Sequence, residues 1–126
     1  MVAILGNLDS SLYKPGDIIL EQSTKVENLI MVSKGKCNLY GFFPDQTKVM
    51  VVGLSERSWY GDYQIMLNLE SSFQLEAGSL NHNDQFVNVF KVKKELIIDL
   101  CTEYPLFRRF LMLRATQRRS YFVKVL

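Results

Sequence analysis

The sequence is poor in the residues that bind metals and cross-link chains. Its 126 residues include two cysteines and one histidine. Cys37 and Cys101 are far apart, each lies in an apolar run, and no C-x-x-C pair is present. His82 lies in the turn-like stretch NHND, without a companion nucleophile or paired carboxylate at a suitable spacing. These absences argue against a disulfide framework and a metal site, and they favour a reducing compartment.

Long hydrophobic runs and catalytic motifs are missing as well. No run approaches the ~20 apolar residues that a membrane-spanning helix needs. The chain does not start with the basic segment of a signal peptide, and residues 1–10 read instead as the remnant of an N-terminal helix. Neither a Walker loop nor a G-x-S-x-G motif is found. We therefore expect a domain without enzyme activity in the cytoplasm.

Net charge is low, but charge is unevenly distributed. The formal net charge of +2 gives no reason to expect a nucleic-acid partner. From Phe107 onward there is no acidic residue, and the basic residues are Arg108, Arg109, Arg114, Arg118, Arg119 and Lys124. A hydrophobic content of 48% is that of an ordinary globular protein. We predict one domain over residues 1–126, with a basic C-terminal end.

Short apolar runs separated by turn residues make up most of the chain. Pro15-Gly16 is typical of a type II turn, because proline fits its second position and glycine accepts the positive φ that follows. Further turns fall at Lys34-Gly35 and at PDQTK. The run VMVVGL at 49–54 is expected to be a strand buried on both faces. The predicted strands are 11–13, 18–22, 29–32, 36–42, 49–54, 73–79 and 86–92. This spacing favours a mainly β fold, an antiparallel β-roll or barrel.

The final third of the sequence changes to a helical period. Apolar residues from Lys93 onward are spaced three and four apart, as one helix face requires, at Leu96, Ile97, Leu100, Cys101 and Tyr104. Pro105 interrupts that helix and can open the next one at its first position. One side of the second helix would carry Phe107, Phe110, Leu111, Arg114, Arg118, Tyr121, Phe122 and Val125. The predicted layout is a β-roll over 11–92 that contains a short helix, followed by helices over 93–126.

This layout resembles the cyclic nucleotide-binding domain. The resemblance rests on YKPGDIILEQ, on the glycine of VSKGK, on YGDYQIML and on the helices after FKVKKEL, and it covers essentially the whole chain. The aromatic-Gly-Asp step and the basic last helix most resemble the domains of voltage-gated-like cation channels, including potassium and cyclic nucleotide-gated channels. The resemblance implies a jelly-roll-like regulatory domain that binds cAMP or cGMP. Its partners would be the rest of a channel polypeptide and its sister subunits, with membrane association only through that parent.

In that family the nucleotide lies across a cassette, which here is residues 59–77. The resemblance assigns Gly61 to a backbone contact with the ligand and Asp62 to the ribose hydroxyl, where the family commonly has Glu. Counted from Gly61, the phosphate-binding Arg falls at Ser71 and its small neighbour at Ser72. Hydrogen bonds to charged groups contribute about 1.5–3 kcal/mol each, and an Arg fork donates twice. We therefore predict that cyclic nucleotides bind weakly or not at all, with an affinity lowered by roughly one to several factors of ten.

The cassette residues also have structural interpretations. Asp62 could cap the short helix, and both serines could simply lead into the next strand. Tyr63 is a candidate contact for the base, but it is expected to pack the helix onto the roll together with Met66 and Leu67. Val51 and Leu69 are core candidates, with a second interpretation as lining residues of a purine pocket.

The basic last helix leaves two other functions open. Arg114 and Arg118 lie one turn apart, so either could swing over the pocket and replace the missing arginine of a working cAMP or cGMP sensor. In the alternative interpretation, both guanidinium groups are solvated surface charges and their aliphatic stems lie along the helix. The helix could also dock a partner protein or anionic lipid. The apolar end formed by Tyr121, Phe122 and Val125 would pack on the roll, fill the pocket as an intrinsic ligand, or pair with another chain.

Overall fold

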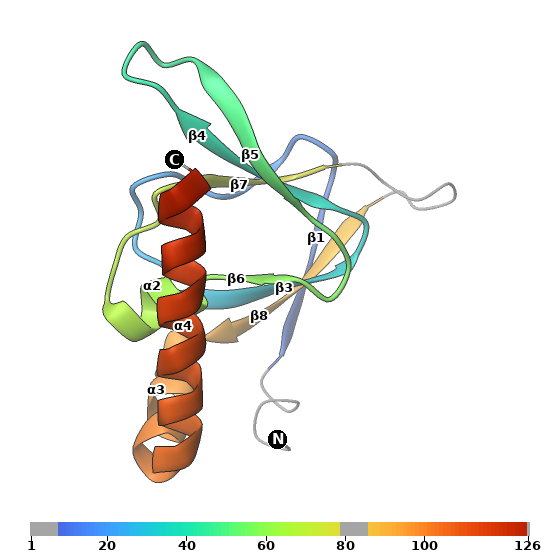
Figure 1. The fold of residues 1–126 in the computed structure, drawn as a ribbon. Helices are drawn as coiled ribbons and strands as arrows, with labels where there is room; N and C mark the ends of the chain where they lie inside the picture. Colours follow the sequence, from blue (N-terminus) through green and yellow to red (C-terminus); the bar gives the residue numbers. More distant parts are fainter. Residues whose placement is uncertain (1–7, 79–85, 126) are drawn as a thin grey trace.

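The computed structural model describes residues 8–78 and 86–125, and side chains as far as residue 120 (Figure 1). The elements are β1 (Asp9–Tyr13), β2 (Ile18–Leu20), β3 (Asn28–Lys34), β4 (Cys37–Phe42), β5 (Lys48–Leu54), β6 (Trp59–Tyr60), α2 (Asp62–Leu67), β7 (Gln74–Ala77), β8 (Val87–Lys93), α3 (Lys94–Glu103) and α4 (Pro105–Val125). His82 lies outside the described residues, as do the side chains of Tyr121, Phe122 and Val125.

Two four-stranded antiparallel sheets form the body of the molecule. Their strand orders are β1-β8-β3-β6 and β2-β7-β4-β5. Side chains from both sheets meet in one buried cluster, which includes Val32, Leu39, Leu75, Val87 and Val89. The predicted antiparallel β-roll is confirmed. Figure 1 shows α4 as a long helix that runs beside the roll and past α2.

The turn at Pro15-Gly16 has the predicted geometry. Gly16 has a φ of 92°, and the amide of Asp17 donates to the carbonyl of Lys14 at 3.0 Å. A positive φ at this position is what a type II turn requires of its glycine. The turn brings the chain from β1 into β2, and so from one sheet to the other.

Two details differ from the sequence-based expectation. Residues 9 and 10 are strand and not helix, because Asp9 pairs with Lys91 and Ser10 with Phe90 in β8. The remainder of the expected helical remnant, residues 1–7, lies outside the described residues. β5 is not buried on both faces, since its first three residues are exposed. The reason is its place at the edge of its sheet, where it pairs only with β4.

The two C-terminal helices meet at Pro105, which is the first residue of α4 as predicted. Phe107 and Leu111 of α4 pack against a second buried cluster formed by Val92, Ile97 and Cys101. Ala115 of the same helix is fully buried in the main cluster.

Two aromatic residues are not on the buried helix faces where the sequence placed them. Phe110 is 57% exposed, because the face of α4 that meets the roll follows Phe107, Leu111 and Ala115 and leaves Phe110 to one side. Tyr104 is 54% exposed, since it caps the end of α3 in an extended conformation.

Both cysteines are buried and free, as expected. Burial raises the pKa of the Cys37 thiol to about 11, so this thiol is protonated near neutral pH and unreactive. Within the described residues, no group of three or more His, Cys, Asp or Glu residues is arranged so that it could hold a metal ion. No described helix combines the length and apolarity that crossing a bilayer requires.

Candidate functional site

Gly61 makes the sharp passage from β6 into α2. Its φ is 110°, a conformation that L side chains rarely adopt. A Cβ atom at this position would lie 2.9 Å from Cγ1 of Val26 and 3.1 Å from the carbonyl oxygen of Asn28. Both the backbone angle and the close neighbours therefore require glycine, independently of any ligand.

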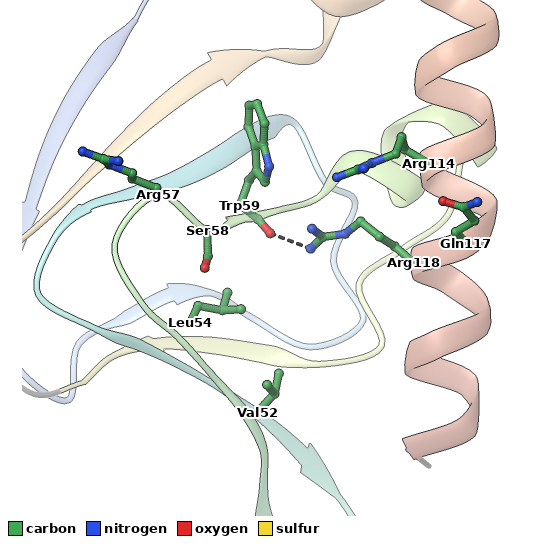
Figure 2. Close-up of a pocket in the computed structure, with 8 residues that line it drawn as sticks. All are labelled: Val52, Leu54, Arg57, Ser58, Trp59, Arg114, Gln117 and Arg118. Atoms are coloured by element: carbon green, nitrogen blue, oxygen red, sulfur yellow. Dashed lines mark hydrogen bonds between the residues drawn. The ribbon is translucent and has the colours of Figure 1, made fainter.

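Asp62, the first residue of α2, binds the last helix. Its Oδ1 lies 3.1 Å from Nε of Arg118. Nη2 of the same arginine donates to the carbonyl oxygen of Trp59 at 2.6 Å (Figure 2). The side chains of Arg118 and Asp62 are 25% and 17% exposed. The N-cap residue of α2 is Gly61, so Asp62 does not occupy the cap position. Against the effect of burial, the backbone N–H groups of Tyr63 and Asp62 still lower the pKa of the Asp62 carboxyl group. One arginine thus ties α4 to the head of the cassette at two points.

The electrostatics of Asp62 explain why it needs a cation. Burial raises the pKa of its carboxyl group, and the positive charge of Arg118 acts in the opposite direction. Arg114 lowers that pKa further by a smaller effect. A carboxylate that has lost much of its hydration is costly unless it is paired. Arg118 is therefore the counter-ion of the Asp62 carboxylate, which is already paired within the protein.

Ser71 lies in the interior, whereas Ser72 is exposed. Ser71 is 1% exposed, and its Oγ donates to the carbonyl oxygen of Phe73 at 2.7 Å. Since that proton is used, the hydroxyl of Tyr60 donates to Oγ of Ser71 at 2.8 Å and accepts from Nε2 of Gln64 at 2.8 Å. Burial raises the pKa of Tyr60 above its usual range, which keeps this donor protonated. Ser71 is thus part of a buried hydrogen-bond chain.

Other cassette side chains pack as the sequence predicted. Tyr63 is buried in the main cluster, and burial raises the pKa of its phenol. The residues packed against this cluster include Val51, Met66, Leu67 and Leu69. The short helix is therefore fixed to the roll by apolar contacts and to α4 by Arg118.

A cavity of about 540 Å³ lies between β5, β6 and α4 (Figure 2). Its lining residues are Val52, Leu54, Arg57, Ser58, Trp59, Arg114, Gln117 and Arg118. Arg114 and Arg118 thus face the same cavity, whereas Gly61, Asp62, Tyr63, Ser71 and Ser72 are not part of its lining. Sequence reasoning missed Trp59 and Arg57 as lining residues. The available signal was a tryptophan directly before the Tyr-Gly-Asp step.

The fold is that of cyclic nucleotide-binding domains. Similar solved structures include the Thermus thermophilus catabolite activator protein (TM-score 0.78, 17% identity, 98% of this chain and 55% of that chain). Another is the regulatory domain of Toxoplasma gondii PKA with cAMP (0.73, 14%, 90% and 41%). A third is the regulatory subunit of a cAMP-independent protein kinase A from Trypanosoma brucei (0.70, 17%, 94% and 38%). The chain spans about half the length of the first of these. No family model and no curated protein matches the sequence.

Proposed function

We propose that the chain is a regulatory domain whose affinity for cAMP and cGMP is weak, and that it belongs to a cation-channel subunit. The interior position of Ser71 carries the first part of the proposal. Its hydroxyl is used within the protein, so the side chain at the family's arginine position presents neither charge nor donor to a phosphate. The channel parent is proposed from the resemblance of the Tyr-Gly-Asp step and of the basic last helix.

The regulatory action would pass through α4. A ligand shifts an equilibrium only by its differential affinity for the two states. A nucleotide that used Asp62 for its ribose would have to displace Arg118, which holds both Asp62 and the Trp59 carbonyl. Binding of such a ligand and attachment of α4 therefore compete, and this competition lowers the affinity further.

Calorimetric titration with cAMP and cGMP at low salt tests this proposal. We expect no saturable heat in the low-micromolar range for either nucleotide. Arg118→Ala should not weaken any residual binding, because the substitution removes a competitor for Asp62. Arg119→Ala is the matched control, since it removes the same charge from the next, exposed position of α4.

Low-micromolar binding by the unmodified chain would refute the weak-binding proposal. If Arg114→Ala or Arg118→Ala then abolished it, the alternative of a working sensor would hold, in which an α4 arginine replaces the missing cassette arginine. The two readings therefore predict opposite effects of removing Arg118.

A further inference from the structure

The cavity between the roll and α4 combines positive charge with an apolar wall. We propose that it binds a small aromatic anion, a planar ring that carries one carboxylate or phosphate group. The anionic group lies against Arg114 and Arg118, and the ring lies against the aliphatic side chains of Val52 and Leu54. This inference rests on the proposed function, because it names the ligand class of the same regulatory domain.

The charges around the cavity call for an anion. Its described lining contains three arginines and no acidic residue. Asp62, just beyond the lining, pairs with Arg118. Arg114 forms no ion pair with any described residue, and its guanidinium lies 5.9 Å from the centre of the Phe110 ring. One carboxylate therefore faces two guanidinium groups, and an added anion would form charge-assisted hydrogen bonds with the second.

The orientation of the side chains assigns this role to two of the three arginines. Figure 2 shows Arg114 and Arg118 projecting from α4 toward Trp59, while the guanidinium of Arg57 points away from them. A guanidinium presents two parallel donors, which match the oxygens of a carboxylate or a phosphate. Two such groups one helical turn apart can hold one anionic group from the same side.

The opposite wall suits a flat ring. Val52 and Leu54 come from β5, and Trp59, the first residue of β6, is 46% exposed. Figure 2 shows the indole of Trp59 pointing away from Val52 and Leu54, so the aliphatic side chains and the exposed indole offer two separate apolar surfaces to an aromatic guest. The volume of about 540 Å³ falls within the range of about 300–1,000 Å³ typical of small-molecule sites.

The ligand needs no sugar. Asp62 is held by Arg118, and the Ser71 hydroxyl is turned into the interior. What the cavity offers is guanidinium and apolar surface, and a ring with one anionic group can use both without a ribose. An anion that binds Arg118 also competes with Asp62 for it, so binding loosens the contact between α4 and the cassette.

Nuclear magnetic resonance of the 126-residue chain tests the site directly. Trp59 is the sole tryptophan, so its indole N–H gives one assigned signal at the cavity. We expect 2-naphthoate and 2-naphthyl phosphate to shift this signal with a Kd below about 1 mM, the range for ligands of this size. The neutral isostere 2-naphthamide should bind at least about tenfold more weakly, because it lacks the charge that the arginines recognise.

Arg114→Gln should weaken 2-naphthoate binding about tenfold or more, since it removes a charged donor. Arg109→Gln is the matched control on the same helix, because Arg109 does not line this cavity, and it should change the Kd less than twofold. The unchanged remainder of each variant's spectrum shows that the variant is folded. The proposal is overturned if neither anion shifts the indole signal, if 2-naphthamide binds equally well, or if Arg114→Gln has no effect.

The same sample separates this inference from the proposed function. Tight binding of cAMP or cGMP would refute weak nucleotide binding, whatever the naphthyl anions do. Absence of naphthoate binding together with weak nucleotide binding would refute only the aromatic-anion site.

Discussion

Ser71 joins two parts of the cassette through hydrogen bonds that are shielded from water. It accepts from Tyr60 and donates to the carbonyl oxygen of Phe73, and Gln64 extends the chain from α2. Such interior bonds are stronger and more costly to break than surface ones, because no water replaces the lost partner. The side chain at this position therefore contributes to internal order.

Ser71→Ala tests this role. We expect the free energy of unfolding to fall by about 1–2 kcal/mol, because the substitution removes the acceptor of the Tyr60 hydroxyl. Ser72→Ala removes the same group from the exposed neighbouring position and should stay within about 0.5 kcal/mol. Urea denaturation at neutral pH measures both. Equal effects of the two substitutions would show that the buried chain contributes nothing specific.

The position of Ser71 could be counted from the sequence, but the direction of its side chain could not. Counting residues from Gly61 requires only the Tyr-Gly-Asp motif. The inward direction depends on nonlocal backbone contacts, since the Ser71 amide donates to Thr24 and the Ser71 carbonyl accepts from Ser23. Arg118 is a similar case. Helical periodicity predicted on which face of the last helix it lies, but not that it binds Asp62 and the Trp59 carbonyl.

At the level of elements, the join between β6 and α2 depends on Gly61. Gly61→Ala would place a Cβ atom 2.9 Å from Val26 and force a side chain into a φ of 110°. We expect a loss of about 2–4 kcal/mol, from backbone strain together with overpacking.

Gly16→Ala separates these two causes. Gly16 also has a positive φ, of 92°, but nothing lies within 4 Å of an added Cβ. Strain alone should then cost about 1–2 kcal/mol. Thermal or urea unfolding of both variants gives the comparison, and equal losses would mean that the contacts of Gly61 with Val26 and Asn28 are unimportant.

Elements with local signals were predicted well, and elements decided by tertiary position were not. The turn at Gly16 and the start of α4 at Pro105 follow from the chemistry of glycine and proline. β5 was expected to be buried on both faces, because its composition is that of an interior strand, yet strand order leaves it at an edge. The composition of a strand indicates that it can be buried. It does not tell whether the strand has a neighbouring strand on both sides in the sheet.

At the level of the whole molecule, α4 is held by two different kinds of contact. Its first half packs through Phe107 and Leu111 on the second cluster. Its second half meets the roll at Ala115 and reaches the cassette through Arg118. The two halves can therefore differ in stability, because apolar packing holds one and polar bonds hold much of the other.

Arg118→Ala should loosen only the second half of α4. We expect amide hydrogen exchange over residues 115–120 to accelerate about tenfold, the loss expected for a charge-assisted contact, while residues 107–112 keep their protection. The pKa of Asp62 should rise further, because Arg118 lowers it in the intact protein. Arg119→Ala serves as the control. Uniform acceleration along α4 would show that the helix moves as one unit.

Ala115 adds a geometric consequence. It is a fully buried residue of α4 with one methyl group as its side chain, so it allows the helix backbone to approach the roll closely. Substitutions at Arg118 can then change how α4 is attached to the cassette without disturbing the interior, whereas enlarging Ala115 would push the helix away from the roll. The attachment of α4 and the packing of the interior thus depend on different positions of one helix, Arg118 and Ala115, and these positions can vary separately.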